Sequence, residues 1–193
     1  MAASPVRPTV APPPAQERPR TVLDLEEDRG AGVVVQTGFL LVAAGMVGLA
    51  LLLDLPVDSA WGPWTVALVT VLACLAYMAL HELTHAGLLW ALTGTRPTVG
   101  VRLPYLVTGS QALLSRRTAT TVALGPLVLW GLVLLGLLAV VPDQVFLTVY
   151  VLAGLNLAGS AGDLLQAWRV GRLPSSALVR DDGRRTTVHL PTD

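Results

Sequence analysis

Residues 64–92 read WTVALVTVLACLAYMALHELTHAGLLWAL, a stretch in which apolar side chains surround a short polar motif. It exceeds the roughly 20 apolar residues that a helix needs to span a bilayer. Three ionisable residues, His81, Glu82 and His85, lie inside it. Ionisable groups are costly within a membrane and mark functional sites there. The stretch is therefore predicted to be a transmembrane helix that carries a site.

Three more apolar stretches accompany this one, at residues 31–53, 118–141 and 145–170. Together the four predict an all-α membrane protein with four transmembrane helices. Charged residues make up 13% of the chain, about half the fraction usual in soluble domains, so a water-soluble globule is disfavoured. The 13 basic residues, all arginine, balance 13 acidic ones, and this neutrality gives no indication of nucleic-acid binding.

The distribution of arginine predicts the orientation of the helices. Every arginine precedes the first span, lies between the second and third, or ends or follows the fourth, while residues 54–63 and 142–144 contain no basic residue. By the positive-inside rule both termini are expected in the cytoplasm. We expect a disordered proline-rich tail at residues 1–30, a transmembrane domain at 31–170 and a C-terminal tail at 171–193. The arginine-rich, lysine-free composition favours a bacterial protein, and hence the bacterial cytoplasmic membrane.

The loop between the second and third spans has strand-like features. Val99, Val101 and Leu103 alternate with smaller or polar residues, and a second run at 105–107 leads to the turn signal Thr108-Gly109-Ser110 before residues 112–114. We expect a small cytoplasmic-side β-hairpin here, with an interfacial loop as the alternative.

The motif His81-Glu82-Leu83-Thr84-His85 is a complete His-Glu-x-x-His pattern. Residues four apart share one face of a helix, so both imidazoles can bind one metal ion. Zinc suits this pair, and a catalytic zinc usually has three protein ligands and a position for water. Glu82 lies beside that face, where it can act as general base. The alternative is that these side chains only make interhelical hydrogen bonds or lie in the interface.

The third ligand has to come from another segment, and depth in the membrane favours Asp163. His85 lies about 10 Å of helix rise before the end of its span, and Asp163 about 9 Å before Arg169 in the fourth. A buried ion pair with arginine, or an interfacial charge, is the alternative for Asp163. His189 lies in the polar tail and is expected to be solvated. A cysteine zinc site is excluded because the chain has one cysteine, Cys74.

Asn156 and Ser160 share a face with Asp163 on the fourth predicted helix. Both are weak candidates for substrate binding, and Asn156 could hold a substrate carbonyl or a developing oxyanion. Interhelical hydrogen bonding is the slightly favoured alternative for Asn156. Tyr77 lies on the His81 side of its helix and is expected to pack.

These motifs resemble those of a known class of membrane proteins. The intramembrane His-Glu-x-x-His, followed by Gly162-Asp163 in another span, resembles the site-2 protease class of intramembrane zinc metalloproteases. Over roughly residues 64–190 the chain more closely resembles a small bacterial membrane family of unknown function, classed as putative zincin peptidases, whose last span has a Ser/Gly-Asp motif. The resemblance implies zinc ligands at His81, His85 and Asp163, with Glu82 as general base. Asn156 is not followed by the prolines of the site-2 motif, so the resemblance implies the metal site more than it implies how substrate is held.

The sequence thus predicts a zinc-dependent metalloprotease, embedded in the lipid bilayer, that cleaves membrane proteins or their juxtamembrane segments. The predicted hairpin is a candidate for pairing with an unwound substrate segment. One alternative is a membrane metal hydrolase acting on a lipid or a small amide. The other is a non-catalytic membrane partner protein with a structural zinc. Neither the oligomeric state nor the substrate identity is predicted.

Overall fold

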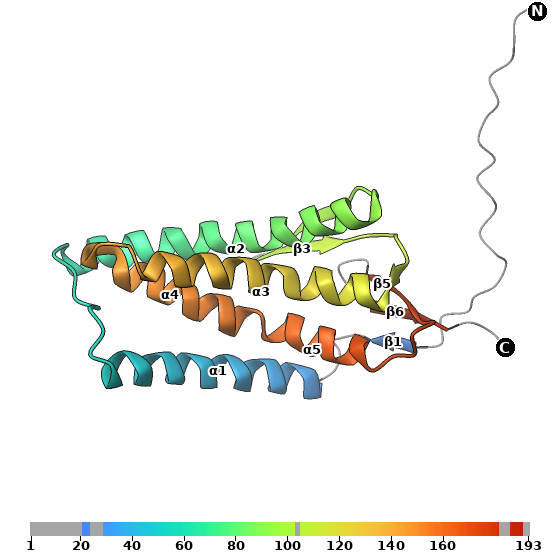
Figure 1. The fold of residues 1–193 in the computed structure, drawn as a ribbon, viewed down its shortest axis with the longest axis horizontal. Coiled ribbons are helices and arrows are strands. Elements are labelled where there is room, and N and C mark those ends of the chain that lie inside the picture. The colour runs from blue at the N-terminus through green and yellow to red at the C-terminus, as the bar shows by residue number, and fades with distance from the viewer. Residues whose placement is uncertain (1–20, 24–28, 103–104, 182–185, 191–193) are drawn as a thin grey trace, which may run out of the picture.

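Four long apolar segments run side by side in a computed structural model of the chain, which describes residues 21–23, 29–102, 105–181 and 186–190 (Figure 1). Three are continuous helices: α1 (Arg29–Leu52), α2 (Pro63–Thr93) and α3 (Arg116–Leu138). The fourth comprises α4 (Asp143–Gly159) and α5 (Ala161–Gly171). All four segments are long and apolar enough to cross a membrane, which confirms the predicted fold class.

Local sequence sets the helix ends. Pro63 begins α2, where its missing N–H would have no helical partner in any case. Gly94 ends it in the left-handed conformation, with φ of 68°, and donates its N–H to the Trp90 carbonyl. Ser115 caps α3 by accepting a hydrogen bond from the Thr118 N–H.

The fourth segment corrects one prediction, because the expected single helix over 145–170 is interrupted at Ser160. Gly159 and Gly162 flank this position, and glycine is a poor helix former because its backbone is so free in the unfolded chain. The break lies three residues before Asp163, so it determines the direction in which the first turn of α5 presents that carboxylate.

The α4–α5 segment lies in the middle of the bundle. It packs against α3 on one side and against α1 on another, while α2 contacts both α3 and α4. Tyr77, Leu134 and Val149 join α2, α3 and α4 in one buried cluster. The outer faces expose large apolar side chains, which suits contact with lipid.

A two-stranded sheet lies next to α2. It pairs β2 (Thr98–Arg102) with β3 (Tyr105–Gly109) in antiparallel fashion, with Thr98 opposite Gly109. The expected hairpin is therefore present, but the expected turn position is wrong. Thr108 and Gly109 belong to β3, because a β-branched threonine suits a strand as well as a loop. Residues 103–104, between the strands, lie outside the described part of the chain.

A second sheet closes the end of the bundle where α3 begins and α5 ends (Figure 1). Its order is β1 (Thr21–Leu23), β6 (Thr186–His189), β5 (Leu178–Asp181) and β4 (Leu114–Ser115), all antiparallel. Strands thus occur in both segments that we expected to be tails, although residues 1–20, 24–28, 182–185 and 191–193 lie outside the described part.

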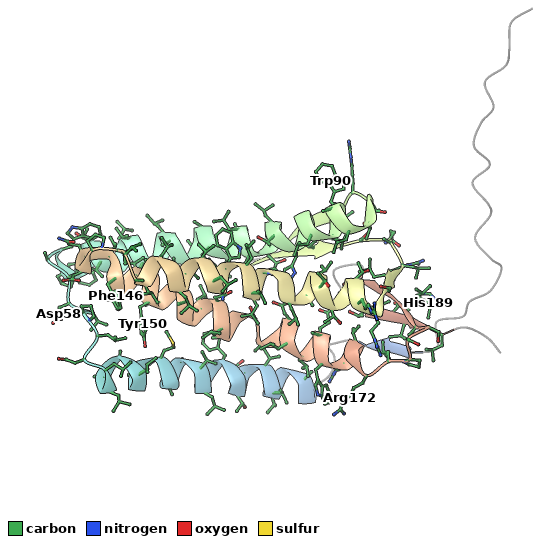
Figure 2. The ribbon with its side chains drawn as sticks, viewed as in Figure 1. Asp58, Trp90, Phe146, Tyr150, Arg172 and His189 are labelled. Carbon is green, nitrogen blue, oxygen red and sulfur yellow. The ribbon has the colours of Figure 1, made fainter. Side chains whose placement is uncertain are left out.

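His189 was expected to be solvated, and that expectation is wrong. Its exposed fraction is 9%, because β6 lies between β1 and β5 inside the second sheet. Figure 2 shows His189 and Arg172 at this end of the molecule and Asp58 at the other. His189 is therefore far along the bundle from the loop between α1 and α2.

Candidate metal centre

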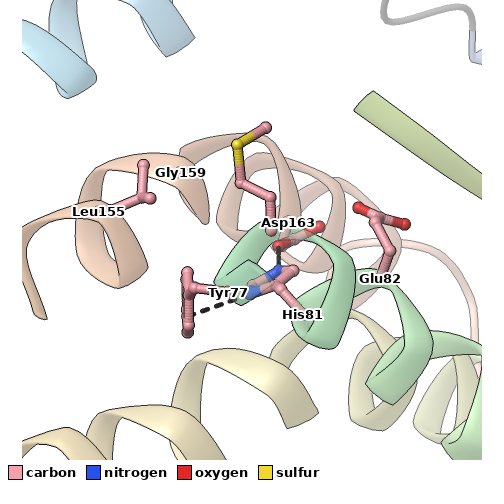
Figure 3. Close-up of a pocket in the computed structure, with 7 residues that line it drawn as sticks. Tyr77, His81, Glu82, Leu155, Gly159 and Asp163 are labelled. Atoms are coloured by element: carbon pink, nitrogen blue, oxygen red, sulfur yellow. Dashed lines mark hydrogen bonds and ion pairs between the residues drawn. The ribbon is translucent and has the colours of Figure 1, made fainter. Parts of the chain in front are cut away.

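Three side chains from two segments converge between α2 and α5. The Nε2 atom of His81 lies 3.2 Å from Asp163 Oδ2 (Figure 3). The Nε2 atom of His85 lies 3.5 Å from Asp163 Oδ1. One ligand atom from each residue can be chosen so that all three lie within 4.8 Å of one another. The residues that sequence reasoning assigned to equal depths in two spans are thus neighbours.

Local structure explains the convergence. His81 and His85 are one helical turn apart on α2, so their rings point the same way, with centroids 5.0 Å apart. Asp163 lies in the first turn of α5, immediately after the break at Ser160. Among the described residues, the ion pairs of Asp163 are with the two histidines and with no arginine, so the alternative of an arginine pair is not what the structure contains.

The remaining ring nitrogen of each histidine has its own partner. His85 Nδ1 lies 2.9 Å from the Val122 carbonyl oxygen. A carbonyl can only accept, so Nδ1 carries a proton, and Nε2 is the ring nitrogen left to bind a metal ion beside Asp163. His81 Nδ1 lies 3.4 Å from the Tyr77 hydroxyl. Partners of this kind fix the orientation and tautomer of metal-binding histidines.

Val122 offers its carbonyl because of a proline. Pro126 lies inside α3, four residues after Val122, and proline has no N–H to complete the helical hydrogen bond to that carbonyl. The His85 ring supplies the missing donor. Pro126 is fully buried, so water does not compete for this position.

The donor set fits a zinc ion. Two imidazole nitrogens and one carboxylate oxygen are typical of catalytic zinc sites. The two histidine nitrogens lie 3.2 and 3.5 Å from the two different oxygens of Asp163, and one ligand atom from each residue lies within 4.8 Å of the others, so the three groups could hold one ion. The three side chains retain exposed fractions of 12%, 11% and 21%, so the centre is open on one side.

That open side faces a pocket of about 240 Å³. Polar and apolar side chains line it together: Tyr77, Met78, His81, Glu82, Leu155, Gly159 and Asp163. Glu82 therefore shares the pocket with two of the candidate ligands, and Figure 3 shows it beside the His81–Asp163 pair. This arrangement allows Glu82 to exchange protons with a molecule in the pocket without occupying the ligand set.

Glu82 is also connected to the two-stranded sheet. The Thr108 hydroxyl of β3 donates to the Glu82 carbonyl oxygen at 3.3 Å. The sheet thus reaches the part of α2 that carries the motif.

The two weak candidates for substrate contact are both buried. Asn156 is 1% exposed and makes interhelical hydrogen bonds to Tyr77 and to the Leu127 carbonyl. Ser160 is fully buried at the break, and its hydroxyl has no hydrogen-bond partner within the described part of the chain.

Sequence reasoning did not identify Tyr77, Thr108 or Pro126 as parts of the site. Pro126 gave a usable signal, since a proline within a predicted span frees the carbonyl four residues earlier. Tyr77 precedes His81 by one helical turn, but its contact with Asn156 depends on how two helices are rotated, which spacing along one helix does not determine.

A comparison with models of known protein families identifies the family of the chain. The model of a family described as putative zincin peptidase matches residues 74–178, which is more than half of the chain and includes the His-Glu-x-x-His motif and Asp163. No curated protein and no solved structure matches the chain.

Proposed function

The chain belongs to the putative zincin peptidase family, and we propose that it is a zinc-dependent metalloprotease that cleaves membrane proteins at or within the bilayer. The observation that carries this proposal is the convergence of His81, His85 and Asp163 inside helices long enough to span a membrane. These three residues would hold the zinc ion.

The proposed chemistry is hydrolysis of a peptide bond. Bound zinc supplies Lewis acidity, which polarises a carbonyl group and makes water more acidic. Glu82 accepts a proton from the attacking water while the oxygen adds to the scissile carbonyl carbon. The C–N bond then breaks, and Glu82 returns the proton to the departing amine. The products are a carboxylate and an amine, so water is the only co-reactant.

Both the pocket and the two-stranded sheet support a peptide substrate. Leu155, Met78 and Gly159 give the pocket an apolar wall beside the polar groups. We propose that an extended, unwound segment of a membrane protein pairs with the edge of the β2–β3 sheet and enters there. The arginine distribution supports a multi-pass protein of the bacterial cytoplasmic membrane with both termini in the cytoplasm.

Glu82→Gln tests the proposed catalysis. The amide keeps the size of the side chain but is not a proton acceptor, so we expect zinc content to be unchanged and cleavage of single-span peptides to fall by about 10²–10⁴-fold. Asp143→Asn, an exposed carboxyl at the start of α4, is the matched control and should leave both unchanged. Zinc is measured by elemental analysis and cleavage by mass spectrometry in lipid nanodiscs.

The same preparation separates the alternatives. Turnover of labelled lipids or small amides without peptide cleavage would favour the lipid or amide hydrolase. If Glu82→Gln keeps both its zinc and full function in cells, the non-catalytic protein with a structural zinc is favoured. Chelation should abolish peptide cleavage, and added zinc should restore it.

A further inference from the structure

A chain of buried hydrogen bonds connects three helices to one candidate ligand. The Asn156 Nδ2 group on α4 donates to the Leu127 carbonyl of α3 at 3.1 Å. Its Oδ1 atom accepts from the Tyr77 hydroxyl of α2 at 2.6 Å. The same hydroxyl oxygen lies 3.4 Å from His81 Nδ1. Tyr77 is 5% exposed and Asn156 is 1% exposed, so water does not replace these partners.

The direction of each hydrogen bond follows from the number of protons. A carbonyl only accepts, so the Asn156 amide turns its NH₂ group toward Leu127 and its oxygen toward Tyr77. Tyr77 has a single hydroxyl proton and gives it to Asn156. The Tyr77 oxygen can then only accept from His81 Nδ1–H. His81 Nε2 lies 3.2 Å from Asp163 Oδ2. Without a metal it can only donate a proton to that carboxylate, and a bound zinc ion would replace this proton.

Asn156 is poorly placed to contact substrate directly. Both functional ends of its amide are already paired, and its side chain is not among those that line the pocket. A substrate carbonyl would have to displace Leu127 or Tyr77 from it. Its influence on the site therefore runs through Tyr77, which does line the pocket.

We propose that Tyr77 and Asn156 are positioning residues that hold His81 as its Nδ1–H tautomer and thereby set the affinity of the site for zinc. The proposal rests on the zinc site of the proposed function. It distinguishes the two histidines, because His85 is oriented by a backbone carbonyl and His81 by two side chains that can be substituted.

Tyr77→Phe is the first test, since it removes only the hydroxyl. We expect the Kd for zinc, measured by competition with a chromophoric chelator, to rise about 10- to 100-fold. Tyr150→Phe is the matched control: this buried tyrosine of α4 donates to the Met46 carbonyl at 2.6 Å, away from the site. Its Kd should equal that of the wild type. Equal Kd values for wild type and Tyr77→Phe would overturn the proposal.

Asn156→Leu tests the direction of the hydrogen bonds between Asn156, Tyr77 and His81. Without an acceptor at 156, the Tyr77 hydroxyl turns its proton to His81 Nδ1 and favours the Nε2–H tautomer, which cannot bind zinc through Nε2. We expect Asn156→Leu to weaken zinc binding more than Tyr77→Phe does. In the double variant the hydroxyl is gone, so the Kd should return to the Tyr77→Phe value. Additive effects, or a raised KM with unchanged zinc Kd, would instead show that Asn156 acts independently of Tyr77.

A metal-free measurement separates this proposal from the zinc site itself. Nitrogen NMR of ¹⁵N-histidine-labelled apoprotein should report a proton on His81 Nδ1 in the wild type and its loss from Nδ1 in Asn156→Leu. This result would support the hydrogen-bond chain even if zinc failed to bind. An unprotonated Nδ1 of His81 in the wild type would refute it whether or not zinc binds.

Discussion

Thr108 shows how one hydroxyl outside α2 can affect the proposed general base. The Thr108 hydroxyl donates to the Glu82 carbonyl oxygen at 3.3 Å and lies near enough to the Glu82 carboxyl group to influence it. Because Glu82 also lines the pocket, its rotamer decides whether the carboxylate reaches an incoming water. A donor on β3 restricts that choice.

Thr108→Val therefore tests whether this single hydroxyl affects Glu82. Valine keeps the shape of threonine and removes the hydroxyl, so we expect kcat to fall about 3- to 10-fold while zinc content stays unchanged. Thr98→Val is the matched control, because the Thr98 hydroxyl also donates to a backbone carbonyl of the hairpin, that of Gly109 at 3.0 Å. Equal kcat values for the two variants would show that Thr108 does not act on Glu82.

Sequence could predict the three candidate ligands because each depends on one-dimensional information. The spacing of His81 and His85 is local to one helix, and the depth of Asp163 follows from counting residues to the end of a span. The contacts of Tyr77 and Thr108 depend instead on the rotation of a helix and the position of a hairpin. Neither is encoded in hydropathy.

Pro126 shows how the backbone of one element prepares the site on another. By leaving the Val122 carbonyl without a helical donor, it gives α3 an acceptor inside the bundle, which His85 Nδ1 uses. The break at Ser160 has a related role, because it starts a new helix beside the pocket with Asp163 in its first turn. Both irregularities lie at the metal centre.

Pro126→Ala tests whether the Val122 carbonyl that the proline leaves free is needed to orient His85. The new N–H can donate to the Val122 carbonyl and compete with His85, so we expect zinc binding to weaken by up to about tenfold. Pro142→Ala, at the exposed cap of α4, is the control and should bind zinc like the wild type. Chelator competition measures both. Zinc affinity unaltered by Pro126→Ala would mean that the freed carbonyl is not needed.

Elements were predictable to different degrees. The four apolar segments follow from window-averaged hydropathy, and their bounds agree within a few residues for α1 and α2. The break at Ser160 was missed because the residues around it are apolar or small and do not lower the average. Strands β5 and β6 were missed because the sheet joins them to distant segments: β5 pairs with β4, more than 60 residues earlier, and β6 pairs with β1 near the start of the chain.

At the scale of the whole molecule, the position of the site depends on which end of the bundle faces the cytoplasm. The second sheet and the C-terminal ends of α2 and α5 lie at the same end, where Arg116 begins α3 and Arg169 and Arg172 lie at the end of α5. Asp58 lies at the opposite end (Figure 2). The positive-inside rule predicts that the sheet end is cytoplasmic.

Single cysteines test that orientation. In a Cys74→Ala background, Asp58→Cys should react with a membrane-impermeant thiol reagent on intact cells, because the α1–α2 connection is predicted to be outside. Ser175→Cys, an exposed position between α5 and β5, should react only after the cells are opened. Labelling of Ser175→Cys but not of Asp58→Cys on intact cells would reverse the predicted topology.

The central claim is that two membrane segments bind one zinc ion through His81, His85 and Asp163. Elemental analysis of detergent-purified protein tests it most directly, with size-exclusion chromatography to verify that each variant remains folded. We predict one zinc per chain in the wild type and in His189→Gln, and almost none in His85→Ala, Asp163→Ala or Asp163→Asn. A full equivalent of zinc in folded His85→Ala and Asp163→Asn would contradict the account.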